Sequence, residues 1–399
     1  MLETQAGRHR EPAGQTTMSK PTRNRPLSRF AASVATALVA FGLSAAARAD
    51  ILIGQTAGFT GQVAASVKEL TLGARLYIDK VNATGGVNGQ KIDLQSLDDG
   101  FDPKRAAANA QTLIDKGAVA LFLTRGTPHT QAVLPLLEKG QVPLIAPSTG
   151  AMLLHKPVHP LVFNVRSTYQ REAERAVQLL LEMGNTRIAL VQVNDTFGAD
   201  GIVGAMAGFN DRKMKPVAHF TYEREKPDIA GVVKQLIAAD PQVVLMVASQ
   251  QITADTINAL RAAGSRILGA TLSNNASNGF VQLLGQNAAG IIVSQVFPSE
   301  RSTNVPMVRE LGDLVKANPA ESNGQVTPAM MEGFASAKVL VEALKRAGKD
   351  PSRAAIQKVL NSMTRFDLGG MEVGYSPTDH TGTNYADIAI IDPRGRFLR

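Results

Sequence analysis

The residues best suited to binding chemistry lie in segment 123–130, which reads Leu-Thr-Arg-Gly-Thr-Pro-His-Thr. A short apolar run typical of a buried strand precedes it, and a run with a helical pattern follows it. We expect Thr127 to cap that helix and Pro128 to be its first residue. Gly126 permits close backbone approach, so amide groups, the Thr127 hydroxyl and Arg125 could converge on a small anion. The alternative is that Gly-Thr-Pro only begins a helix.

Other polar groups follow apolar runs in the same way. Ser148 and Thr149 supply hydroxyls after the run 142–146, and Gly150 leaves the backbone exposed. This triplet either lines a ligand site beside the first loop or forms an ordinary turn. In the second half of the chain the matching positions are Phe197, Ser249, Gln250, Thr271 and Ser273. They offer one apolar face and uncharged hydrogen-bonding groups.

The sequence gives little support for catalysis. It contains no phosphate-binding Gly-x-x-x-x-Gly-Lys-Ser/Thr, no Gly-x-Ser-x-Gly, no His-Glu-x-x-His and no cysteine. None of its six histidines pairs with a carboxylate at metal-ligand spacing. We expect His129 to be a solvated or polar-lining residue, and Asp102, near the Asp98-Asp99 pair, to cap a helix rather than hold a cation. The sequence therefore predicts a binding protein without catalytic residues, metal or cofactor.

Elements that would position these residues alternate along most of the chain. Expected strands are 50–55, 91–97, 119–123, 142–146, 161–165, 187–193, 216–222, 242–247, 266–272 and 290–296. Expected helices are 64–81, 104–116, 131–139, 169–183, one from 199, 228–239, 252–263, 305–316, 326–346 and 351–363, before two strands, 366–375 and 385–391, joined by a polar turn. Such alternation predicts an α/β fold with parallel sheets flanked by helices. Ligands of these sheets lie beyond the carboxyl ends of the strands, where the polar loops would meet.

Composition and charge narrow the setting. Residues 1–49 combine a basic segment, an uncharged alanine-rich run from Phe30 to Ala46 and the small-x-small triplet before Asp50, which together predict a cleaved export signal. A retained anchor is the alternative, and Met18 is a possible internal start. Residues 1–49 carry seven Lys or Arg and two Glu, so the remaining chain has a net charge of +3, against +8 for all 399 residues. Scattered charge of this size gives no footprint for nucleic acid.

An ordered set of short motifs resembles a known family. The set comprises Gly73-Ala74 with Ile78-Asp79 and Asn82, Gly85-Gly86-Val87-Asn88-Gly89, Asp98-Asp99 with Asp102-Pro103, Val142-Pro143-Leu144-Ile145 with Pro147-Ser148, Asp195 with Phe197-Gly198, and Leu260-Arg261-Ala262-Ala263-Gly264. Over about 50–395 the chain resembles the type I periplasmic binding proteins of the leucine/isoleucine/valine-binding kind, the soluble receptors of ABC importers. Each motif alone is unspecific, and the order of the set carries the resemblance.

The resemblance implies two Rossmann-like lobes joined by three hinge crossings, near 165–168, 294–298 and 375–384. Lobe 1 would comprise 50–166 and 297–377, and lobe 2 would comprise 167–296 and 378–399. It also implies that the loop at Gly126 and Thr127 holds a ligand carboxylate and that the loop at 148–150 holds the head group. A monomer in the periplasm that delivers a small ligand to an inner-membrane ABC permease is the expected function.

Two positions depart from the family pattern. The aromatic residue matching Phe197 is usually a tyrosine, and no carboxylate stands at 271–273, where the family often places the partner of a ligand ammonium. Three ligand classes therefore stay open: an amino acid, an amine-free carboxylate that could be aromatic, and a small amide. Whether Arg125 and His129 face the cleft also stays open. Alternatives to transport are a sensory domain of the same fold and an α/β enzyme.

Overall fold

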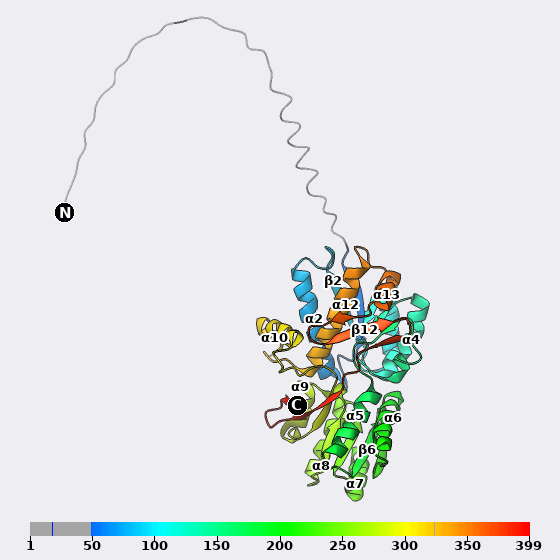
Figure 1. The fold of residues 1–399 in the computed structure, drawn as a ribbon, viewed down its shortest axis with the longest axis vertical. Coiled ribbons are helices and arrows are strands. Elements are labelled where there is room, and N and C mark those ends of the chain that lie inside the picture. Colours follow the sequence, from blue (N-terminus) through cyan, green and yellow to red (C-terminus); the bar gives the residue numbers. More distant parts are fainter. Residues whose placement is uncertain (1–17, 19–48, 323) are drawn as a thin grey trace, which may run out of the picture. The chain divides into compact units, whose positions relative to one another are not determined.

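Two parallel β-sheets organise the chain in the computed structural model, which describes Met18, residues 49–322 and residues 324–399. Residues 49–399 form one unit in which each sheet is the centre of a lobe (Figure 1). The expected export signal lies outside the described residues, apart from Met18 and Ala49. In the part of the chain that is described, no helix is long and apolar enough to cross a membrane.

The first lobe is built on a five-stranded parallel sheet with the order β2-β1-β3-β4-β5. Its strands are β1 (Ile51–Ala57), β2 (Ile92–Asp98), β3 (Ala120–Phe122), β4 (Leu144–Ile145) and β5 (Val162–Phe163). Its connections contain α2 (Ala64–Ala83), α3 (Pro103–Asp115), α4 (Thr127–Gly140) and the short η1 (Met152–Leu154). Strands β1, β3, β4 and β5 are almost entirely buried because helices cover both faces of the sheet, which explains their apolar runs. The edge strand β2 is only partly buried, and its apolar and polar residues alternate.

The second lobe is built on a seven-stranded sheet with the order β15-β14-β10-β9-β8-β6-β7. Five strands are parallel: β6 (Ile188–Val193), β7 (Ala218–Tyr222), β8 (Val243–Val247), β9 (Leu268–Thr271) and β10 (Ile292–Gln295). Helix α5 (Tyr169–Glu182) precedes β6, and the connections between the strands contain α6 (Thr196–Asp211), α7 (Ile229–Ala239), α8 (Gln250–Ala262), η2 (Ser273–Asn275), α9 (Asn278–Leu284) and η3 (Gly285–Asn287). The antiparallel strands β14 (Asp387–Ile391) and β15 (Phe397–Leu398) extend the β10 edge.

The chain between β10 and β14 returns to the first lobe, as expected from the long helical runs. It contains α10 (Pro306–Ala317), α11 (Pro319–Ser322), α12 (Pro328–Ala347), α13 (Arg353–Asn361) and a small antiparallel sheet of β11 (Phe366–Asp367), β12 (Glu372–Ser376) and β13 (Asp379–Gly382). Apolar residues of this segment share one core with β1, β3 and α2. In Figure 1, α12 accordingly lies beside α2, although more than 200 residues separate them in the sequence.

Two glycines allow the close packing of α2 against α12. A Cβ on Gly73 would lie 2.1 Å from the carbonyl oxygen of Met330, and one on Gly333 would lie 1.8 Å from that of Leu70. The two helix backbones can approach this closely only where a side chain is missing.

Most expected elements are confirmed, but three helices begin earlier than expected: α4 at Thr127, α6 at Thr196 and α8 at Gln250. The polar residues before α6 and α8 cap the first turn rather than forming a loop. Asp195 accepts hydrogen bonds from the amides of Phe197 and Gly198, and Ser249 accepts one from Ile252. Strand β15 was not expected, and the predicted polar turn 376–384 contains strand β13.

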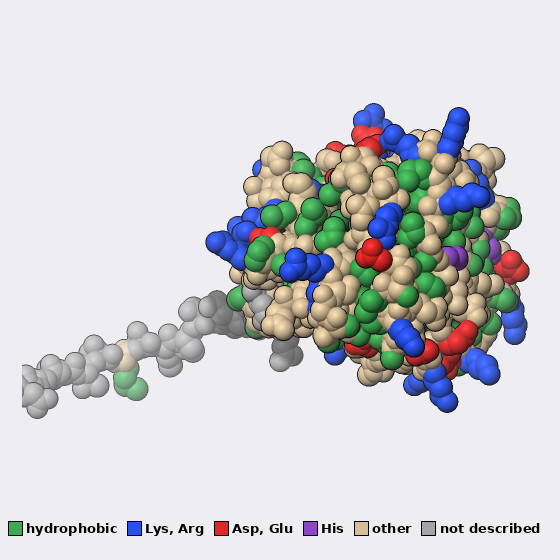
Figure 2. Space-filling view, turned by 90° about the horizontal axis from the view of Figure 1, so that it is seen from below, with side chains coloured by type: hydrophobic (Ala, Val, Ile, Leu, Met, Phe, Trp, Pro, Cys, Tyr) green, Lys and Arg blue, Asp and Glu red, His purple; other side chains and the backbone are tan. Residues whose placement is uncertain are grey.

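Charged side chains are distributed rather than concentrated. On the face drawn in Figure 2, Lys and Arg side chains lie apart from one another among apolar and acidic groups.

Candidate functional site

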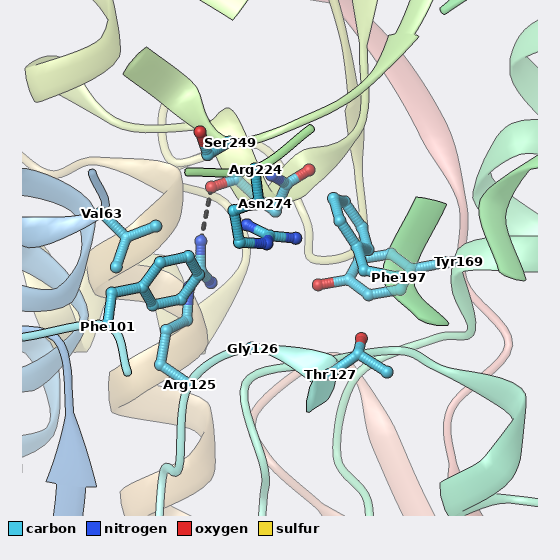
Figure 3. A pocket seen from close by; sticks show the side chains of 10 residues that line it. All are labelled: Val63, Phe101, Arg125, Gly126, Thr127, Tyr169, Phe197, Arg224, Ser249 and Asn274. Atoms are coloured by element: carbon cyan, nitrogen blue, oxygen red, sulfur yellow. Dashed lines mark hydrogen bonds between the residues drawn. The ribbon is translucent and has the colours of Figure 1, made fainter. Parts of the chain in front are cut away.

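A pocket of about 300 Å³, its open mouth included, lies where the strands of both lobes end. Ten residues line it: Val63, Phe101, Arg125, Gly126, Thr127, Tyr169, Phe197, Arg224, Ser249 and Asn274 (Figure 3). Each follows the carboxyl end of a strand, from β1 (Val63) to β9 (Asn274). This is the edge at which parallel α/β sheets bind ligands.

Arg125 faces the pocket, which answers the question of its orientation. It is 5 % exposed, and its guanidinium donates hydrogen bonds to Ser148 Oγ at 2.8 Å and to the carbonyl of Asn274, in the second lobe, at 2.7 Å. Ser66 Oγ lies at 3.5 Å. Among the described residues, no carboxylate lies within ion-pairing distance of this side chain. Burial accordingly lowers the pKa of Arg125 from its ordinary value.

Gly126 and Thr127 begin α4 beside Arg125, and here the expected cap is wrong. Gly126 is the N-cap, with φ 92° and ψ 143°, and Thr127 is the first helical residue. The Thr127 hydroxyl instead shares a hydrogen bond of 2.8 Å with Thr149 Oγ1. Because the amides of a first helical turn have no partner within the helix, this turn still presents donors to an anion.

His129 is not a solvated or polar-lining residue, contrary to expectation. It is 1 % exposed, and its ring stacks on that of Phe101 at 4.1 Å between centroids. Neither ring nitrogen has a hydrogen-bond partner among the described residues. Burial lowers the pKa of His129 to about 4, so the ring is neutral near pH 7. His129 thus supports the pocket wall made by Phe101.

The loop at 148–150 lies directly behind the lining residues. Ser148 accepts a hydrogen bond from Arg125, Thr149 pairs with Thr127, and the carbonyl of Gly150 accepts from the amide of Tyr169 at 2.7 Å. All three are buried, and none of them lines the pocket. Their contacts fix the positions of residues that do.

The predicted residues of the second lobe separate into two groups. Phe197 and Ser249 line the pocket, while Gln250, Thr271 and Ser273 do not. The Thr271 hydroxyl is used within the lobe, where it donates to the carbonyl of Met246 at 2.9 Å. The side-chain Oε1 of Gln250 accepts from Ser277 Oγ at 3.4 Å.

Five lining residues were not expected from the sequence: Val63, Phe101, Tyr169, Arg224 and Asn274. Tyr169 packs edge-on against Phe197 at 4.8 Å, and Figure 3 shows its hydroxyl pointing into the pocket. Arg224 lies over the Phe101 ring at 5.2 Å and donates from Nε to Asp195 at 2.6 Å. Listing the residues just beyond every expected strand would have included Arg224 and Asn274, whereas Tyr169 lies after a crossing between lobes.

A buried ionic network lies beside the pocket. Arg166 forms an ion pair with Glu172 and donates a hydrogen bond of 2.6 Å to Ser273 Oγ. Its guanidinium also lies 3.7 Å from the carboxylate of Glu332. Glu172 also accepts from the amide of Ser273 at 2.9 Å. Nearby carboxylates, together with the ring of Tyr169, outweigh burial and raise the pKa of Arg166. These carboxylates are therefore already engaged by an arginine.

The two lobes touch around the pocket. Gln62 of the first lobe donates to the carbonyl of Arg224 at 3.0 Å and accepts from Ser249 Oγ at 2.9 Å. At the far side of α2, Glu69 accepts from the amides of Asn278 and Gly279 at the start of α9. The described structure is thus one in which the lobes are closed on each other.

The described residues contain no group of three His, Asp or Glu side chains that could hold a metal ion. Asp102 caps α3, as expected, by accepting from the amides of Lys104 and Arg105.

Comparison with known proteins gives consistent matches over nearly the whole described length. The sequence profile of a family described as periplasmic binding protein matches residues 50–396. The Leu/Ile/Val-binding protein homolog 3 of Brucella melitensis is 25 % identical over 357 residues, covering 87 % of this chain and 93 % of that protein.

Solved structures agree in fold. A substrate-binding periplasmic protein from Ralstonia solanacearum matches with a TM-score of 0.81 and 28 % identity, covering 88 % of this chain and 99 % of that one. A possible leucine/isoleucine/valine-binding protein from Rhodopirellula baltica matches with a TM-score of 0.82 and 24 % identity, covering 88 % and 97 % of the two chains.

Proposed function

Because this chain belongs to the periplasmic binding protein family, we propose that it is the solute receptor of an ABC importer. It captures a small anionic ligand between its lobes and delivers the ligand to an inner-membrane permease. The negative charge of the ligand is inferred from Arg125, a buried cation on the pocket wall that contacts no carboxylate among the described residues. The relatives named for leucine, isoleucine and valine bind molecules that also carry a carboxylate.

Energetics support an anion. Burying an unpaired charge costs on the order of several kcal/mol, so a ligand carboxylate that reaches Arg125 removes a penalty present in the empty pocket. The negative charges of Glu172 and Glu332 act on Arg125 from a distance and raise its pKa, whereas the positive charge of Arg166 lowers it. Burial remains the largest influence on the pKa of Arg125. The amides at the start of α4 and the Thr127 hydroxyl would complete the carboxylate site.

Delivery requires that the lobes open and close. The chain passes between the sheets after β5, after β10 and between β13 and β14, and we propose that these three segments act as the hinges. Hinge closure of two lobes around a ligand is a common mechanism of solute capture. We further propose that residues 1–49 direct export to the periplasm, where the mature protein acts as a monomer.

A ligand screen tests the function. Thermal unfolding of the mature chain is measured with amino acids, amine-free carboxylates and the corresponding amides, because a ligand that binds only the folded state raises the Tm. We expect carboxylates to raise the Tm and amides not to. Uptake of the identified ligand by cells that lack the gene, compared with complemented cells, then tests transport. Normal uptake in the deletion strain would contradict the proposed role in import.

A further inference from the structure

The charges that face the pocket are unbalanced toward the positive. Arg125 and Arg224 are its charged lining residues, and the ten lining residues include no Asp or Glu. Carboxylates close in the chain or structure to lining residues have other partners: Asp195 pairs with Arg224, Glu172 pairs with Arg166, and Asp99 accepts hydrogen bonds from Thr56 and the amide of Phe101. A ligand ammonium would therefore meet cations on the pocket wall and no carboxylate free to pair with it.

Most neutral acceptors in the pocket are already engaged. The carbonyl of Asn274 accepts from Arg125, Ser249 Oγ donates to Gln62, and Thr127 Oγ1 shares a hydrogen bond with Thr149 Oγ1. The hydroxyl of Tyr169, which points into the pocket, can both donate and accept. Asn274 Oδ1 is a buried acceptor without a partner among the described residues. An ammonium has three donors, and leaving some of them unpaired in a closed cleft costs on the order of several kcal/mol.

Aromatic rings form opposing walls of the pocket. Figure 3 shows Phe101 of the first lobe on one side and Phe197 with Tyr169 on the other, with Arg125 beside Phe101. Stacking on His129 and the overlying Arg224 fix the Phe101 ring, while the edge-on contact with Tyr169 fixes Phe197. Two ring walls separated by a small cavity suit a flat apolar body, which gains both burial and ring-to-ring contacts.

From this combination we infer that the ligand is an amine-free carboxylate on an aromatic body, an aryl or arylalkyl acid. Arg125 binds the carboxylate and the ring lies between Phe101 and Phe197. This inference rests on the proposed receptor function and narrows its ligand class.

Matched ligand pairs test the absence of an ammonium. Phenylalanine and 3-phenylpropanoate differ only by the α-amino group, as do leucine and 4-methylpentanoate. Isothermal titration calorimetry on the mature protein should give a Kd for 3-phenylpropanoate lower than that for phenylalanine by at least about tenfold, or about 1.4 kcal/mol. 3-Phenylpropanamide, which has no charge, should bind more weakly than the acid by at least about the same factor.

The outcomes separate the two proposals. Tighter binding of phenylalanine or leucine than of their amine-free counterparts overturns the inference and leaves the receptor function standing. Tighter binding of 4-methylpentanoate than of 3-phenylpropanoate overturns the assignment of an aromatic body. Failure of every carboxylate, with or without an amine, contradicts both the inference and the proposed receptor function.

Substitution of Arg125 gives an independent test. Arg125→Met should weaken 3-phenylpropanoate by at least about a hundredfold but the amide by less than about threefold, because only the acid uses the charge. Arg212→Met, at a half-exposed arginine paired with Glu182 at the end of α6, is the matched control and should leave both affinities unchanged. Equal losses for acid and amide in Arg125→Met would show that Arg125 acts only through the shape of the pocket, which overturns its assigned contact.

Discussion

At the scale of single residues, the pocket depends on a strained backbone position. Gly126 has φ 92° and ψ 143°, a region populated almost only by glycine, and a Cβ there would lie 2.6 Å from His129 Nδ1 and 2.9 Å from Phe101. The glycine lets the α4 amides, the stacked His129–Phe101 pair and Arg125 occupy one small volume. Its function is therefore geometric.

Gly126→Ala should reduce the free energy of unfolding by about 3 kcal/mol, since backbone strain and overpacking add. Gly264→Ala is the matched control, because Gly264 also has a positive φ, 75°, but open space around it. Its expected cost is about 1 kcal/mol. Urea denaturation measures both, and equal losses would show that contact with His129 and Phe101 is unimportant.

A second prediction at this scale concerns pH. The folded-state pKa of His129 is about 4, below the ordinary 6.5, because burial disfavours the charged ring. The unfolded chain therefore binds a proton first as the pH falls, and stability that is present above pH 6.5 is lost as the pH falls toward 4. His155, with a pKa of about 4 for the same reason, contributes in the same direction.

His129→Phe keeps a ring against Phe101 and removes the titration. The loss of unfolding free energy between pH 7 and 4.5 should be smaller in this variant than in the wild type by about 2 kcal/mol. Burial also lowers the pKa of His219, which is exposed on β7, so His219→Phe is the control and should reduce the loss by clearly less than His129→Phe does. An unchanged pH dependence in His129→Phe would mean that the buried ring does not resist protonation.

At the scale of elements, α2 and α9 hold the lobes together away from the pocket. Glu69 accepts from the amide of Gly279 at 2.8 Å, and a Cβ on Gly279 would lie only 2.2 Å from the Cβ of Ala65. No ligand-lining residue takes part in this contact. The pair of helices can therefore influence affinity only through closure.

Gly279→Ala should push α9 from α2 and so disfavour the closed form. We expect affinity for the ligand to fall by at least about tenfold, while the ligand-free protein keeps its unfolding free energy within about 0.5 kcal/mol because opening relieves the clash. Gly312→Ala on α10, where a Cβ meets nothing within 4 Å, should leave the affinity unaltered and raise the free energy of unfolding by about 0.5–1 kcal/mol. Calorimetry and urea denaturation check both, and unaltered affinity in Gly279→Ala would exclude closure at this contact.

At the scale of the whole molecule, Arg166 joins the lobes at the first crossing. It bonds to Glu172 and Ser273 in the second lobe and lies 3.7 Å from Glu332 on α12 of the first. The network is fully buried, so each carboxylate depends on the arginine for its charge balance.

Arg166→Met leaves two buried carboxylates without their cation and should cost about 3–5 kcal/mol of unfolding free energy. Arg171→Met, which removes a half-exposed arginine paired with Glu174 on α5, should cost less than about 1 kcal/mol. Equilibrium denaturation compares the two. Similar small losses would show that Glu172 and Glu332 are stable without Arg166.

Sequence patterns alone determined the α/β architecture. A strand buried on both faces gives a short continuous apolar run, whereas a helix buried on one face gives apolar residues that recur with the helical period. They also placed Arg125, Gly126, Thr127, Phe197 and Ser249 at strand ends that line one pocket. These properties follow from each residue's position within its own element and the common direction of parallel strands.

Tertiary structure decided which groups remain available to a ligand. The hydroxyl of Thr271 and the side-chain carbonyl of Gln250 bond within the second lobe, while Tyr169, from beyond a crossing, supplies the hydroxyl that Phe197 lacks. Among the described residues no carboxylate pairs with Arg125, and Asp195 and Glu172 pair with Arg224 and Arg166 instead. Such pairings join residues far apart in the chain, so no local pattern encodes them, and they determine the charge that the pocket presents.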